Sequence, residues 1–153
     1  MAVLLGALKM RYGRATVFDP IREQVYAGEH NTFRGAFDES FSVAEARQLL
    51  SELSLHFRVT TPKLTTRAAF WTLKGWYRVS TKTIHLSVPA SDYRYKDAIG
   101  ILRNLPKQHV RAASVIHEFT HHLQHSWRLR YGTPPHDCNF ASLLEAVYES
   151  LGY

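Results

Sequence analysis

A five-residue motif, His117-Glu118-Phe119-Thr120-His121, contains the residues best suited to chemistry in this sequence. If the segment is helical, residues four apart share one face about 6 Å apart, so the two histidines can bind one zinc ion. Glu118, one step around the helix, leaves the metal free and can act as general base on a metal-bound water. Zinc lowers the pKa of that water and polarises a substrate carbonyl. The motif therefore predicts a zinc-dependent peptidase with Glu118 as its catalytic base.

A third zinc ligand must come from outside the motif, and the sequence offers four candidates. His122 points about 100° away from His121. His125 continues the correct face, but three ligands along one straight helix would be spread over about 12 Å. His136 follows a Gly-Thr-Pro-Pro turn that lets the chain return, and Glu145 lies on the next predicted helix. On the residues alone, His136 and Glu145 both stay open.

Three helices are predicted around this motif. The motif itself falls in a helix from about 107 to 128, with Gly132 as a stop signal ahead of two prolines. Upstream, a capping-box pattern and apolar residues at helical spacing predict an amphipathic helix over 43–57. Downstream, a helix over 138–151 carries one apolar face. The helix over 43–57 is expected to be part of the scaffold.

Short strands are predicted between the first and second of these helices. Apolar and aromatic runs at 68–73, 76–80 and 83–88, separated by turn residues, indicate three antiparallel strands. In zincin folds the last strand beside the active-site helix is an edge that pairs with an extended substrate, and here that strand would be Thr83 to Val88. An ordinary sheet edge protected by Lys82 is an equally good interpretation. Residues 98–105 indicate a short helix that ends at Pro106.

The fold expected from this order is α+β, with a small antiparallel sheet packed on the active-site helix. Residues 1–36 contain two short strand signals, at 16–18 and 24–26, and are interpreted as an N-terminal extension. Residues 37–153 then form the catalytic domain.

The motif and its surroundings resemble the SprT-like metalloproteases, which include the Spartan proteases that degrade proteins crosslinked to DNA. The resemblance rests on the H-E-x-x-H helix, on Tyr131-Gly132-Thr133-Pro134-Pro135-His136 and on Phe140 at the start of the final helix, and it covers about residues 40–153. It implies a zincin-like fold with zinc on His117, His121 and His136 and with Glu118 as base. Metzincins are excluded, because their longer motif needs glycine at Gln124 and histidine at Trp127.

The composition indicates which partners the protein favours and in which compartment it is expected. The net charge of +6 favours nucleic acid or an acidic surface, although solubility alone accounts for it equally well. Cys138 is the only cysteine, so no internal disulfide can form and an intracellular protein, cytoplasmic or nuclear, is expected. No signal peptide is recognised, and no apolar stretch approaches the roughly 20 residues that span a bilayer. A soluble protein without membrane contact is expected.

Aromatic residues beside lysines indicate an alternative function. Phe70, Trp71 and Trp76 lie near Lys74 and Lys82, the mixture that stacks bases and neutralises phosphates in single-strand binding, although most of these rings are expected in the core. The leading hypothesis is a zinc metallopeptidase that cleaves proteins or peptides, among them DNA-associated ones, with single-stranded DNA as a possible partner. The alternative is a nucleic-acid-binding protein with a structural zinc site and no proteolytic activity.

Overall fold

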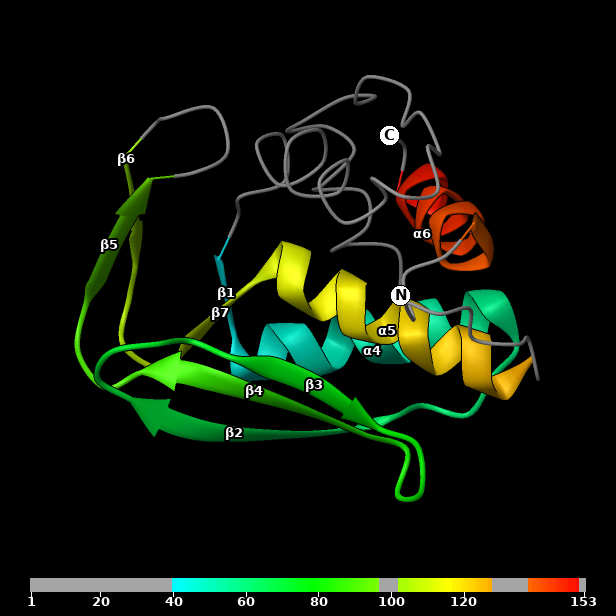
Figure 1. Cartoon of the computed structure of the whole chain (residues 1–153), viewed down its shortest axis with the longest axis horizontal. Helices are drawn as coiled ribbons and strands as arrows, with labels where there is room; N and C mark the ends of the chain where they lie inside the picture. Colours follow the sequence, from blue (N-terminus) through cyan, green and yellow to red (C-terminus); the bar gives the residue numbers. More distant parts are fainter. Residues whose placement is uncertain (1–39, 97–101, 128–137, 152–153) are drawn as a thin grey trace.

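The computed structural model describes residues 40–96, 102–127 and 138–151, and within them the chain is of mixed α+β class, as expected (Figure 1). The elements in chain order are β1 (Ser40–Ser42), α4 (Val43–Phe57), β2 (Lys63–Ala69), β3 (Gly75–Arg78), β4 (Thr83–Pro89), β5 (Tyr93–Lys96), β6 (Leu102–Leu105), β7 (His109–Arg111), α5 (Ala112–Ser126) and α6 (Cys138–Ser150). None of the helices in these ranges is both long and apolar enough to cross a membrane.

Helix α4 confirms the prediction for 43–57. The Ser42 hydroxyl accepts a hydrogen bond from the Glu45 backbone N–H at 3.2 Å, and the Glu45 carboxylate accepts one from the Ser42 N–H at 3.1 Å. This capping box satisfies two N–H groups that the first turn leaves without helical partners. Arg58, in the left-handed conformation at φ 55°, ends the helix and donates its N–H to the last carbonyls.

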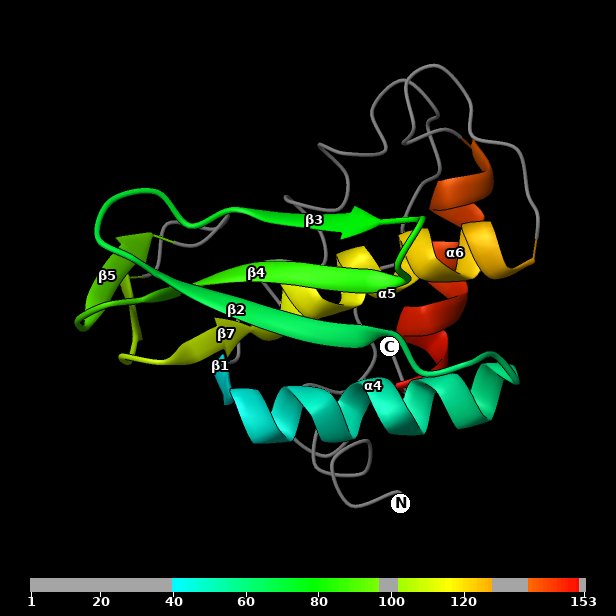
Figure 2. The ribbon, with the colours of Figure 1, turned by 90° about the horizontal axis from the view of Figure 1, so that it is seen from below.

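The central sheet differs from the predicted antiparallel arrangement. Its order is β2-β4-β3, with β4 parallel to β2 and antiparallel to β3 (Figure 2). The prediction assumed that strands consecutive in sequence pair with one another, which is the commoner arrangement. Here β4 enters between β2 and β3 instead, so Thr83 to Val88 is the centre of the sheet and the prediction of an edge at this strand is wrong.

Two further predictions fail between β4 and α5. Residues 102–105 form strand β6, paired with β5 in a two-stranded sheet, where a helix over 98–105 was predicted. The motif helix begins at Ala112 rather than near 107, because 109–111 pair as β7 with β1, Phe41 opposite Val110. Val110 suits a strand as well as a helix, and its partner lies about 70 residues away in sequence. A local pattern therefore could not distinguish the two.

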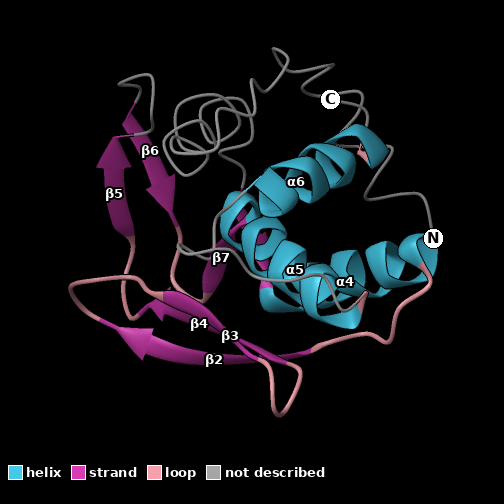
Figure 3. Ribbon diagram, turned by 45° about the vertical axis from the view of Figure 1, so that its right-hand side comes forward, coloured by secondary structure: helices cyan, strands magenta, loops and turns pink. Residues whose placement is uncertain are grey.

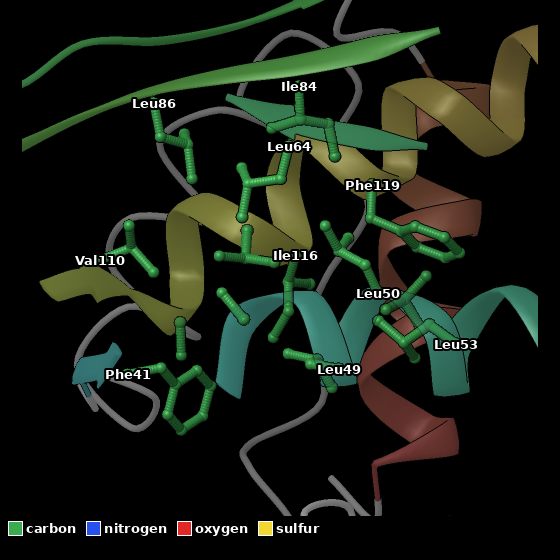
Figure 4. Close-up of a cluster of buried hydrophobic side chains, with 14 of the residues drawn as sticks. Phe41, Leu49, Leu50, Leu53, Leu64, Ile84, Leu86, Val110, Ile116 and Phe119 are labelled. Atoms are coloured by element: carbon green, nitrogen blue, oxygen red, sulfur yellow. The ribbon is translucent and has the colours of Figure 1, made fainter. Parts of the chain in front are cut away.

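The hydrophobic core lies between the sheet and the helices, which gather on one side of the strands (Figure 3). Leu64, Ile84 and Leu86 point from the sheet towards Ile116 and Phe119 of α5 (Figure 4). Leucines of α4 and apolar residues of α6 complete the cluster. Helix α5 is therefore held on more than one side, and its position relative to the sheet is fixed by packing.

Some predictions concern residues outside the described ranges. They include the two strands at 16–18 and 24–26, the Gly-Thr-Pro-Pro turn and His136. The final helix, predicted over 138–151, is confirmed as α6.

Candidate metal centre and catalytic carboxylate

His117 and His121 lie on one face of α5 with their Nε2 atoms 3.2 Å apart. Two nitrogens that each bind zinc at about 2.0–2.1 Å would, at this separation, make an angle of about 100° at the ion, close to the tetrahedral value. The rings meet edge to face, with 4.9 Å between their centroids. The spacing of the two nitrogens therefore fits a shared zinc ion without a change of backbone.

Gln124 determines which nitrogen of His121 can act as a ligand. Its amide oxygen lies 3.2 Å from Nδ1 of His121. In this orientation of the amide the oxygen accepts a hydrogen bond from Nδ1–H, which leaves the lone pair on Nε2, facing His117, while Nε2 of Gln124 is buried without a hydrogen-bond partner. Metal-binding histidines are usually oriented by such a hydrogen bond on the second ring nitrogen. Gln124 is fully buried, so its position is set by the core.

Phe140 of α6 forms an aromatic wall beside the two histidines. Its ring centroid lies 5.0 Å from that of His117 and 4.6 Å from that of His121. The Phe140 side chain is buried, and α6 packs against α5. The first turns of α6 therefore lie next to the histidine pair.

Glu118 occupies the neighbouring face of α5, against the sheet. It is 7% exposed, and a Cβ added at Gly75, the first residue of β3, would lie 3.4 Å from its Oε1. The same Cβ would lie 2.7 Å from Cδ2 of Leu86, closer than real contacts allow. The lack of a side chain at Gly75 thus allows the end of β3 to approach the Glu118 carboxylate.

His122 follows the motif directly and has a different environment. Its Nε2 donates to the backbone carbonyl of Thr60 at 2.7 Å, so its Nδ1 accepts from the Tyr77 hydroxyl at 2.8 Å. Burial lowers the pKa of His122, and the charges of Lys82 and His125 act in the same direction, against the opposing hydrogen bond to Thr60. The neutral ring joins β3 and the α4–β2 connection to α5, and it points away from the histidine pair, as its place in the sequence indicates.

Among the described residues, no third candidate ligand joins the two histidines. Within 40–96, 102–127 and 138–151, no group of three His, Cys, Asp or Glu residues comes together as a metal site. Glu145, the rival candidate, lies five residues after Phe140, about 140° around α6, and does not join the two histidines. His136, two residues before α6, lies outside the described residues.

The edge strand beside the site and the hydrogen bonds of its histidines could not be predicted from the motif alone. Strand β3 takes the edge position predicted for 83–88, since among the described strands it pairs only with β4, and it lies against α5. The hydrogen bonds of Gln124 and of Tyr77 were also not predicted. The spacing of Gln124, three residues after His121, is the one sequence signal for its role.

The aromatic residues near 70 also differ from expectation. Phe70 and Trp71 are 76% and 86% exposed, and Trp76 is 49% exposed, so these three rings are not part of the core.

Comparison of the chain with protein-family models, with curated proteins and with solved structures finds no match.

Proposed function

We propose that this protein is a zinc-dependent metallopeptidase with a zincin-like fold, with the metal held by His117, His121 and His136. The observation that carries the proposal is the 3.2 Å separation of the two Nε2 atoms on one helix, with the Gln124 amide at the other ring nitrogen of His121. Without a metal the two nitrogens are within hydrogen-bond distance of each other, and the same convergence suits a shared zinc ion.

Glu118 is the proposed catalytic base. When bound, zinc would polarise the scissile carbonyl and increase the acidity of a water molecule beside it. Glu118 accepts the proton of the attacking water and delivers it to the leaving amine. Its 7% exposure favours this role, because a carboxylate largely removed from bulk water interacts more strongly with the reacting groups.

Strand β3 is the proposed docking edge for the substrate. An extended peptide that pairs with β3 would lie about 4.8 Å from it and would pass the end of the strand where Gly75 approaches Glu118. Backbone pairing recognises any extended segment, so an unfolded protein is the natural substrate class. The resemblance to SprT-like enzymes adds DNA-associated proteins to this class.

His136 is assigned as third ligand on the resemblance and on chain length. It lies four positions before Phe140, and four positions span at most about 14 Å. Since the Phe140 ring contacts both histidines, His136 is within reach of the same point.

The decisive experiment measures cleavage of a fluorescently labelled unfolded protein by the zinc-loaded chain and its variants. Glu118→Gln is expected to keep the zinc and to lose about 10²- to 10⁴-fold of the activity, the usual contribution of a general base. Glu145→Gln is the matched control, because it neutralises a carboxylate of α6 away from the histidines, and it should retain activity. Undiminished cleavage by Glu118→Gln would refute the proposal.

A further inference from the structure

The net charge of the chain is concentrated in one stretch. Between Leu53 and Ser91 the sequence has six Lys and Arg residues and no Asp or Glu, whereas the rest of the chain has 13 of each sign, because 19 basic residues less these six leaves 13 against 13 acidic ones. The whole net charge of +6 therefore resides in the segment that contains β2, β3 and β4.

Strand register places four of these cations on the outer face of the sheet. Leu64, Ile84 and Leu86 point into the core, so their sequence neighbours face outward. One outward row is Lys63, Thr83 and Arg78, and the next is Thr65, His85 and Trp76. A third row holds Arg67 and Ser87, and the hydrogen bond from the Ser87 N–H to the Lys74 carbonyl extends it to Lys74.

The four cations thus stand at the corners of a three-by-three grid with an aromatic pair in its middle row. The Trp76 and His85 rings are stacked, with centroids 4.8 Å apart and planes 16° apart, and the Thr65 hydroxyl holds His85 through Nδ1 at 2.6 Å. Trp76 remains 49% exposed, so His85 supports the ring while leaving much of its surface open. Phe70 and Trp71 add two exposed rings in the connection between β2 and β3.

We infer that the outer face of the β2-β4-β3 sheet binds single-stranded nucleic acid. Cations around a ring with an open face match a ligand with phosphates along a backbone and bases that stack. Residues four apart on a strand, such as Lys63 and Arg67, are separated by about 13 Å, and residues on the two outer strands by about 9.6 Å, so the corner cations can contact phosphates on either side of a base that covers Trp76. This face lies on the opposite side of the sheet from α5 (Figure 2), so the ligand leaves the histidine pair accessible.

Single strands are favoured over other anionic partners by the rings. A duplex keeps its bases stacked internally and would use only the cations. An acidic peptide offers charge but no planar groups to cover Trp76. An anionic membrane could take up the exposed rings of Phe70 and Trp71, but it offers no planar group to stack on Trp76 between the four cations.

The test is fluorescence anisotropy with a labelled single-stranded oligonucleotide, compared with the same sequence as a duplex, with a poly-glutamate peptide and with phosphatidylserine vesicles. We expect the single strand to bind most tightly and to quench tryptophan fluorescence. Trp76→Leu should weaken binding about 5- to 150-fold, the equivalent of about 1–3 kcal/mol for one stacked base. Lys63→Ala and Arg67→Ala should each lower the salt dependence of binding by about one counterion.

Matched controls come from residues outside the β2-β4-β3 sheet. Trp127→Leu removes another part-exposed tryptophan, at the end of α5, and Lys107→Ala removes an exposed cation near β7, and neither should change binding. His121→Ala should also bind normally, which separates this inference from the proposed peptidase. Equal binding of duplex and single strand, unchanged binding by Trp76→Leu, or binding of vesicles or poly-glutamate in place of the oligonucleotide would overturn it.

Discussion

His121 and His122 are adjacent in sequence and occupy two different regions of the molecule. His121 directs Nε2 at His117 and has Gln124 on its other nitrogen. His122 is fully buried and has both nitrogens occupied, by the Tyr77 hydroxyl and the Thr60 carbonyl. The 100° step between consecutive helical residues separates a ring suited to bind a metal from one that fastens the sheet to the helix.

The difference shows that the environment, rather than the residue type, decides what each histidine can do. A metal ligand needs one nitrogen directed at the metal and an acceptor for the N–H of the other nitrogen, whereas a structural histidine needs both nitrogens satisfied inside the protein. The comparison also links the two regions, since His122 holds β3, the strand that approaches Glu118. Changes around either histidine should therefore have distinct measurable effects.

The largest effect is expected at Gln124. Gln124→Leu removes the acceptor for the Nδ1 proton of His121 and places an apolar side chain of similar size in the buried position. Zinc affinity should fall about 10- to 100-fold, the usual cost of losing such a partner, with the fold retained. Competition with a chromogenic chelator measures the affinity, and unchanged affinity would show that Gln124 does not orient a ligand.

The next effect is expected at Tyr77, on the structural side of the comparison. Tyr77→Phe leaves Nδ1 of His122 buried without its donor, so the free energy of unfolding should fall by about 1–2 kcal/mol in urea denaturation. Zinc stoichiometry should not change. Tyr93→Phe, in a part-exposed tyrosine of β5, is the control and should cost less than about 0.5 kcal/mol. A loss of zinc in Tyr77→Phe would show that the two regions are not separate.

The smallest effect is expected at Gly75. Gly75→Ala brings a methyl group within 2.7 Å of Cδ2 of Leu86, and the shift that follows displaces the end of β3 beside Glu118. The cost should be about 1 kcal/mol of stability, at the lower end for overpacking, because the end of a leucine side chain can turn aside. Leu86→Val in the same chain removes the clashing methyl and should restore part of the loss, as a double-mutant cycle would show. Strictly additive effects would contradict the contact.

Sequence reasoning succeeded where the chemistry is local. Helix α4 follows its capping box to the residue, and the alignment of His117 and His121 follows from helical periodicity. The final helix is also where its apolar face predicts it. Each of these depends on residues no more than a few helical turns apart, so the sequence pattern alone is enough to predict the local structure.

Sequence reasoning failed where distant segments meet. The parallel pairing of β4 with β2, the pairing of β7 with β1 and the hydrogen bond between Tyr77 and His122 join residues 20 to 71 positions apart. No local pattern specifies a partner at that distance, so the sheet order and the docking edge were assigned incorrectly. The exposed positions of Trp71 and Trp76 belong to the same class, because exposure depends on which face of a strand the rest of the fold covers.

The most direct test of the central claim is the zinc content of the purified chain and of single histidine variants, measured by elemental analysis. The account predicts one zinc per chain in the wild type, its loss in His117→Ala, His121→Ala and His136→Ala, and its retention in His125→Ala, a histidine of the same helix outside the proposed ligand set. Zinc retained in His121→Ala, or lost equally in His125→Ala, would contradict the assignment of the metal centre.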